Sequence, residues 1–103
     1  SGKITPDRPL EDYREAVIQA AFNALTAARN TLKEGERIVQ ILSLTVYLNA
    51  SPDYTTHAKV GDIASNWLYE QLGEAGVGPR AAIGVATLPG NAPVEIQLVA
   101  AAG

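Results

Sequence analysis

The 103-residue sequence has no cysteine and only one histidine, His57. Without cysteine, the chain can form neither a disulfide framework nor a thiolate metal site. A single histidine is also too few for a multi-histidine metal centre. We therefore expect no metal site and no cofactor in this protein.

Long apolar runs and clustered positive charge are missing as well. No apolar run approaches the roughly 20 residues of a membrane-spanning helix, and no signal-peptide pattern is visible at the start. The eight lysines and arginines are scattered, the net charge is −3, and aromatic residues make up only 6% of the chain. Domains that bind nucleic acids usually carry a clustered basic surface. We expect a soluble, cytoplasmic protein that binds neither membranes nor nucleic acids.

The residues that are present suffice for one hydrophobic core. The chain is 47% hydrophobic and 18% charged, and 103 residues is the size of a single domain. A domain this small buries a modest fraction of its surface, so an oligomer interface would add to its stability. We expect one domain over residues 1–103.

Helical spacing of apolar residues extends from Pro9 to about Leu32. Pro9 suits the first helical position, and Glu11, Asp12 and Glu15 place negative charge near the positive end of the helix dipole. The stripe is rich in alanine, so this helix can pack closely against a sheet. Its members are Tyr13, Val17, Ala20, Ala21, Ala24, Ala28 and Leu32.

Residues 37–49 alternate with a period of two and contain β-branched and aromatic residues, which predicts a strand. One predicted face is apolar and suited to contact the helix. The other is mixed, which favours a subunit interface or a cleft. The apolar face comprises Leu42, Leu44, Val46 and Leu48, and the mixed face Val39, Ile41, Ser43, Thr45 and Tyr47.

The rest of the chain predicts a second helix and two more strands. Ser51 is a suitable N-cap, helical spacing extends over 60–72, and Gly73 is a plausible stop. Strand patterns then cover 80–88 and 94–101. The turn sequence at 89–91 between them favours a β-hairpin. The expected order is helix, strand, helix, strand, strand.

Two segments carry a family resemblance. Gly78-Pro-Arg-Ala-Ala-Ile-Gly-Val-Ala-Thr-Leu-Pro89 followed by Pro93-Val-Glu-Ile96, and Val46-Tyr-Leu-Asn49 followed by Ser51-Pro-Asp-Tyr54, resemble the RidA/YjgF (reactive intermediate deaminase, endoribonuclease L-PSP-like) family, in a less typical branch. The resemblance implies an α+β fold. We expect a YjgF/chorismate-mutase-like mixed sheet with two helices on one face, three copies meeting through the other face, and pockets between subunits.

The start of the chain differs from the family pattern. Ser1-Gly-Lys-Ile4 resembles a turn that closes the family's second strand, so the N-terminal β-hairpin is expected to be missing. Three explanations stay open: the hairpin is a separate peptide chain, it is lost, or the first two residues are a remnant of cloning.

The resemblance implies roles for two side chains. Arg80 matches the arginine that binds a substrate carboxylate, for which a planar guanidinium is well shaped. Ala82 and Gly84 share its predicted face, and small residues there would leave room for a ligand. Glu95 matches the family's glutamate, which is thought to help position or protonate the water that hydrolyses an imine. The alternative for each is a solvated surface charge.

Two positions depart from the family pattern. The common cysteine two residues after the arginine is Ala82, and the usual asparagine of the second helix falls near Asp62, which changes the charge of any site it lines. Tyr47 on the mixed face is a candidate pocket residue or interface aromatic. His57 is expected to be solvated, and Trp67 to be part of the core.

Ser1 suggests a different enzyme class. If the chain begins there naturally, its α-amine lies beside its own hydroxyl, as in N-terminal nucleophile hydrolases. The matching serine of the family lies at the ligand pocket, so Ser1 would be close to Arg80.

Three functions remain open on the sequence. The first is a hydrolase of small carboxylate-bearing molecules, an enamine or imine deaminase in which Arg80 and Glu95 act. The second is a self-processed amidohydrolase with Ser1 as nucleophile. The third is a trimeric, non-catalytic module that binds small molecules.

Overall fold

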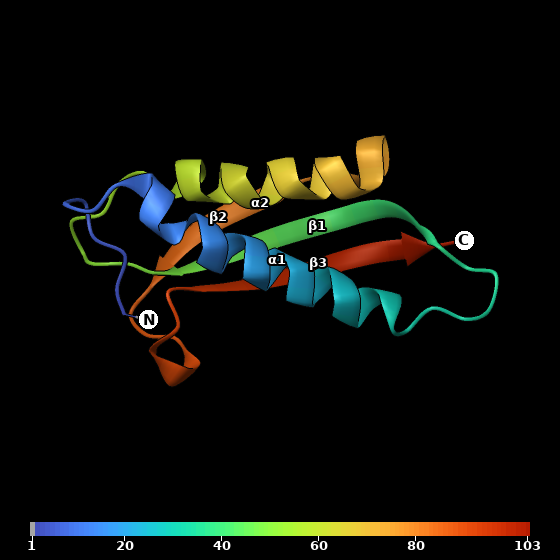
Figure 1. Cartoon of the computed structure of the whole chain (residues 1–103), viewed down its shortest axis with the longest axis horizontal. Helices are drawn as coiled ribbons and strands as arrows, with labels where there is room; N and C mark the ends of the chain where they lie inside the picture. Colours follow the sequence, from blue (N-terminus) through green and yellow to red (C-terminus); the bar gives the residue numbers. More distant parts are fainter. Residues whose placement is uncertain (1) are drawn as a thin grey trace.

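The computed structural model describes residues 2–103 as an α+β fold (Figure 1). The elements follow the expected order of helix, strand, helix, strand, strand, with short 3-10 turns between them. Their bounds are η1 Leu10–Tyr13, α1 Arg14–Arg29, β1 Ile38–Asn49, α2 His57–Leu72, η2 Gly73–Gly76, β2 Arg80–Val85, η3 Pro89–Asn91 and β3 Val94–Ala102.

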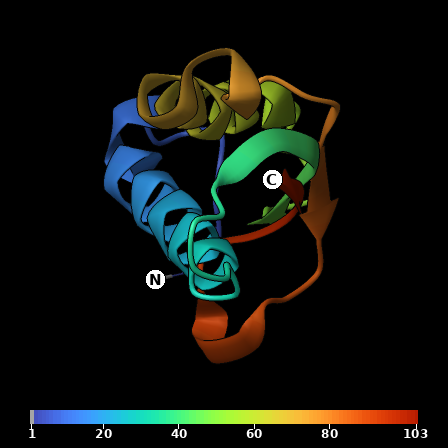
Figure 2. The same cartoon turned by 90° about the vertical axis from the view of Figure 1, so that its right-hand side faces the viewer.

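The three strands form a mixed sheet in the order β2-β1-β3. β1 pairs with β2 in parallel and with β3 in antiparallel orientation. Both helices lie on one face of the sheet, as Figures 1 and 2 show. The expected mixed sheet with two helices on one face is thus confirmed.

The predicted hairpin of the last two strands is wrong. β2 and β3 lie on opposite sides of β1 and do not pair with each other. The segment 86–93 between them is long enough to pass the end of β1 and bring β3 back along its other edge. Turn residues at 89–91 therefore mark a reversal of the chain, although no tight hairpin forms there. Within residues 2–103, the outer edges of β2 and β3 have no strand partner.

The alternation in β1 holds only in its second half. The register with β3 shifts between Ile38 and Gln40 and again between Ile41 and Ser43. Each shift adds one unpaired residue, as in a β-bulge, and reverses which face the next side chains take. Leu42 is therefore 50% exposed, while Ile41 is 1% exposed and part of the core. The sequence pattern placed Leu42 on the apolar face and Ile41 on the mixed face, which is the reverse of the observed arrangement.

The first helix is shorter than its apolar pattern. Pro9 precedes a 3-10 turn, closed by the bond from the Asp12 N–H to the Pro9 carbonyl (3.1 Å), and α1 begins only at Arg14. At the other end, the Thr31 N–H bonds to the Ala28 carbonyl three residues back (3.1 Å). The helix therefore ends at Arg29. Its buried residues are Val17 and Ala21, which belong to the predicted stripe, and Leu25, which directly follows Ala24 of that stripe.

The second helix begins later than Ser51. The Ser51 N–H bonds to the Ile4 carbonyl (2.9 Å), which keeps the chain extended there, and its hydroxyl bonds to Asp53 (2.6 Å). α2 starts at His57, and Gly73 ends it with a positive φ of 63°, a conformation in which glycine has no steric penalty.

Asn49 holds the N-terminal segment against the end of β1. It is the buried polar residue of the core, and the Ile4 N–H donates to its carbonyl (2.7 Å). The Lys3 ammonium donates to the Asn49 side-chain oxygen (2.9 Å), and the Asn49 amide donates to Asn91 and Ala92 (3.1 and 3.2 Å). All its side-chain polar atoms are thereby satisfied, as burial demands.

None of the helices among the described residues has the length and apolarity required to cross a membrane.

Candidate functional site

Arg80 lies at the start of β2, on the face of the sheet that the helices cover. Its Cα pairs with that of Leu44, whose side chain is buried in the core. The guanidinium donates to the Asp62 carboxylate at 2.6 Å and to the Ser65 hydroxyl at 3.2 Å, both on α2. The side chains of Arg80 and Asp62 are 24% and 60% exposed. Arg80 is thus fixed by α2 at the boundary between core and solvent.

The small residues beside Arg80 have a packing role. A Cβ added to Gly61 of α2 would lie 3.2 Å from the Ala82 Cβ and 3.2 Å from the Arg80 Cζ. A Cβ added to Gly84 would lie 2.7 Å from the His57 Nε2. Ala82 and Gly84 therefore let α2 approach β2 closely.

Glu95 and Tyr47 lie on the open face of the sheet. Their Cα atoms are paired across β3 and β1, and the Tyr47 hydroxyl donates to the Gln97 side-chain oxygen at 3.1 Å. Glu95 itself is exposed and has no ion pair among residues 2–103. No helix within the described residues 2–103 covers this face (Figure 2). The open face thus offers a carboxylate, a phenol and an amide to whatever contacts it.

The structure brings Arg80, Asp62 and Ala82 together and leaves Glu95 and Tyr47 elsewhere. Arg80 is in register with Leu44, and Glu95 is in register with Tyr47, three residues further along β1. Because side chains alternate along a strand, Arg80 and Glu95 point to opposite faces of the sheet. They cannot act on one ligand within a single copy of the chain.

The expectation that Ser1 lies beside Arg80 concerns a residue outside the described range. The next residue, Gly2, donates its N–H to the Asn91 carbonyl at 2.8 Å. Asn91 lies in η3, which follows the C-terminal end of β2, whereas Arg80 opens that strand.

His57 is less solvated than the sequence suggested. It is half-buried as the first residue of α2, with its ring 5.3 Å from that of Tyr54 and its imidazole over Gly84. It lines a hollow of about 330 Å³ at the C-terminal end of β2. Glycine at position 84 was the available signal, because a strand glycine often marks a close approach. Trp67 is partly buried against the core, as expected, and meets Phe22 edge-on at 6.3 Å.

No group of three or more His, Asp or Glu side chains within residues 2–103 is arranged to hold a metal ion.

Known proteins share this fold. The chain is 31% identical in sequence to Agrobacterium tumefaciens Atu1372, a protein of unknown function, with a TM-score of 0.83 over 97% of this chain and 64% of the other. It is 29% identical to a Shewanella oneidensis protein named a "putative endoribonuclease", with a TM-score of 0.84 over 96% of this chain and 66% of the other. This chain has a RidA/YjgF-like fold.

A comparison of sequences alone also matches nearly the whole chain. Trypanosoma cruzi protein TCP17 is 28% identical over 98 residues, which is 94% of this chain and 61% of TCP17. The chain thus spans less than two thirds of the length of each of these relatives. No family model matches the sequence.

Proposed function

We propose that the protein hydrolyses small carboxylate-bearing enamines or imines at sites shared between copies of the chain. An enamine first becomes its imine by transfer of a proton from nitrogen to carbon. Water then adds across the C=N bond, and the resulting carbinolamine breaks its C–N bond to release ammonia and the carbonyl product. The observation that carries the proposal is the anchored Arg80 guanidinium at the edge of the core. The RidA/YjgF-like fold supports the same reaction class, although fold alone does not fix chemistry.

Arg80 would bind the substrate carboxylate. Its guanidinium is held by Asp62 and Ser65, so little side-chain entropy is lost when a ligand binds. The bonds to both partners come from the same nitrogen, Nη1, which leaves Nη2 and Nε of the planar group without a protein partner in residues 2–103. That geometry suits a two-point contact with a carboxylate.

Asp62 would set the charge of the site. Where the resemblance leads one to expect an asparagine, this chain has a carboxylate 2.6 Å from Arg80. A ligand carboxylate must therefore bind next to Asp62 or displace it from Arg80. Because like charges repel, Asp62 should weaken binding of simple carboxylates and favour ligands that also carry a positive or neutral nitrogen.

Glu95 would act from a neighbouring copy. It lies on the open face, opposite to Arg80, so a second copy has to supply it to the same ligand. Its carboxylate would take a proton from the attacking water and return it to the leaving nitrogen. We propose a homotrimer built on the open faces, with Thr45 and Tyr47 at the contact, in which the open face of one copy extends past the β2 edge of the next and so reaches its Arg80. Ile41, which we expected to contribute, is in the core of its own chain.

A non-catalytic binding module is the second candidate. Two observations favour it: the Arg80 guanidinium already bonds to Asp62, and Ala82 stands where the resembled family commonly has a cysteine. Such a module would bind a small zwitterion at Arg80 and Asp62 without turnover. The self-processed amidohydrolase depends on Ser1, and no contact in residues 2–103 favours it.

The test is ammonia release from the imine of a small 2-oxo acid generated in solution. Arg80→Ala should lower kcat/KM by more than about tenfold, because a hydrogen bond to a charged group contributes that much binding. Arg14→Ala, which removes an exposed arginine of α1, should leave the rate unchanged. Asp62→Asn should lower KM. Full turnover by Arg80→Ala would place the site elsewhere, and binding without turnover by the unaltered protein would favour the module.

A further inference from the structure

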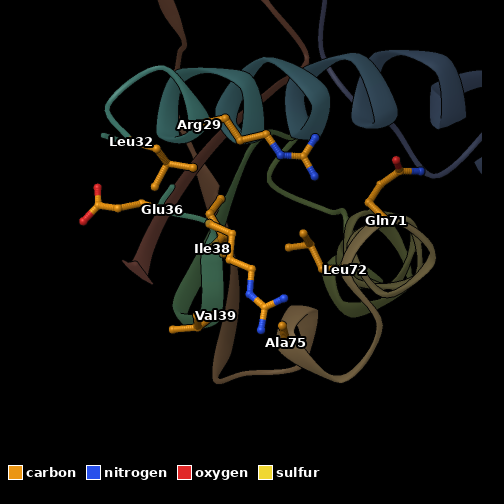
Figure 3. A pocket seen from close by; sticks show the side chains of 9 residues that line it. Arg29, Leu32, Glu36, Ile38, Val39, Gln71, Leu72 and Ala75 are labelled. Atoms are coloured by element: carbon orange, nitrogen blue, oxygen red, sulfur yellow. The ribbon is translucent and has the colours of Figure 1, made fainter. Parts of the chain in front are cut away.

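A second cleft lies at the opposite end of the molecule from η3. It has a volume of about 650 Å³ and is formed by the ends of α1 and α2 and the start of β1 (Figure 3). It shares no lining residue with the surroundings of Arg80. Ligand sites of small molecules usually enclose about 300–1,000 Å³. Its size alone therefore allows a small organic ligand.

Two arginines from separate elements line this cleft. Arg29 is in the last turn of α1, and Arg37 immediately precedes β1. Neither guanidinium makes an ion pair with residues 2–103, where all three ion pairs involve other residues. The Arg37 backbone is fixed by two hydrogen bonds with Gly103, at 3.1 and 3.0 Å. With two arginines and one carboxylate, that of Glu36, in its lining, the cleft is net positive in a chain whose net charge is −3.

One acidic residue, Glu36, also lines the cleft, and it makes no ion pair with either arginine within residues 2–103. The Glu36 carboxylate accepts a hydrogen bond from the Lys33 N–H at 2.7 Å. Figure 3 shows its side chain directed away from Leu72 and Gln71, on the far side of Leu32 from the Arg29 guanidinium. Both guanidinium groups therefore remain free to bind an external anion.

The floor of the cleft is apolar. Leu32 of the loop after α1, Ile38 of β1 and Leu72 of α2 face one another there (Figure 3). Ile38 is a core residue, and the other two are partly buried against the core. An anion without an apolar part would leave this surface in contact with water. The cleft therefore matches a molecule that joins an anionic group to a hydrophobic group.

We propose that this cleft binds small organic anions with an apolar body, such as aryl or alkyl carboxylates, through Arg29 and Arg37. The guanidiniums hold the anionic group, and the Leu32, Ile38 and Leu72 side chains cover the hydrophobic part. Planar guanidinium groups bind carboxylates through paired hydrogen bonds. The proposal is independent of the reaction assigned to Arg80.

The experiment is a titration of the protein with 4-phenylbutyrate, followed by calorimetry and by amide chemical shifts. The neutral 4-phenylbutanamide and the cationic 4-phenylbutylamine are matched probes of the same shape. The carboxylate should bind at least about tenfold more tightly than either probe, because each charge-assisted hydrogen bond can contribute that much. Shifts should concentrate at residues 29–39 and 71–75.

Matched variants identify the groups responsible. Arg29→Gln with Arg37→Gln should reduce carboxylate affinity by at least about tenfold. Arg14→Gln with Lys59→Gln makes the same change in net charge elsewhere and should have little effect. The double lysine variant, Arg29→Lys with Arg37→Lys, should retain part of the affinity, which separates loss of charge from loss of fold.

Arg80→Ala should leave this binding unchanged, so the two sites can fail separately. Equal affinity for the amide and the carboxylate would overturn the proposal. So would shifts confined to the neighbourhood of Arg80, or an affinity that the Arg29 and Arg37 changes leave intact.

Discussion

The two faces of the sheet differ in how completely one chain satisfies them. On the covered face, Leu44, Val46 and Leu48 are buried under the helices, and Arg80 has partners on α2. On the open face, Ile83 and Val99 are 44% and 50% exposed, interspersed with Glu95 and Gln97. The covered face therefore packs completely within one chain. The open face mixes exposed apolar and polar side chains, and it is the face that we propose to associate with other copies.

The two faces are therefore constrained by different things: helix packing constrains the covered face, and the proposed association would constrain the open face. Residues of the covered face are small or apolar because α2 packs on them, as the fit of Gly61 against Ala82 illustrates. The exposed apolar residues of the open face have no such reason within the chain. Substitutions on the first face should therefore change stability, and those on the second should change association.

The largest contrast should come from a charge placed on each face of β1. Val46→Asp buries an unpaired carboxylate in the core and should remove most of the stability, which is about 5–15 kcal/mol for an ordinary domain. Thr45→Asp, one residue earlier, should leave each chain folded and prevent assembly. Circular dichroism and sedimentation measure the two effects. A stable, fully assembled Thr45→Asp variant would contradict the role of the open face.

A smaller contrast should separate two valines of β3. Val94 is 7% exposed on the covered face and Val99 is 50% exposed on the open face. In dilute protein, Val94→Ala should lower the free energy of unfolding by about 2 kcal/mol. Val99→Ala should lower it by less than about 0.5 kcal/mol. At concentrations where copies associate, the cost of Val99→Ala should rise. Denaturation at both concentrations tests this, and equal costs for the two valines in dilute protein would be against it.

The smallest effect should follow from Tyr47→Phe. This change removes the hydrogen bond to Gln97 on the open face, at 3.1 Å, and keeps the ring. We expect a loss of about 0.5 kcal/mol, the low end for a net hydrogen bond, because water can replace the partner. Urea denaturation measures it. A loss of several kcal/mol would mean that the face is already covered.

Much of the fold could be predicted from local pattern. The spacing of Val60, Ile63, Ala64 and Leu68 indicated α2, and the alternation of Leu44, Val46 and Leu48 indicated β1. The bulges near Val39 and Leu42 could not be predicted, because they depend on the register that β3 imposes. The position of β1 between β2 and β3 is likewise a long-range choice that the turn at 89–91 does not reveal.

The sequence predicted some residues of the candidate site but not how the fold arranges them. The resemblance selected Arg80, and Asp62 proved to be its partner through a contact 18 residues apart. The separation of Arg80 and Glu95 by the sheet could not be inferred without knowing which strands flank β1. Neither could the cleft at Arg29 and Arg37, since it forms only where two helix ends and a strand meet.

The central claim is that Arg80 and Glu95 act together only across two copies, and subunit complementation tests it most directly. Arg80→Ala and Glu95→Gln proteins should each be inactive in imine hydrolysis. Unfolded together and refolded as a mixture, they should recover roughly a quarter of the unaltered activity, because random assembly in a cyclic trimer gives that share of sites with both native residues. Native mass spectrometry would verify the mixed assemblies. Verified mixed assemblies that remain inactive would contradict the account.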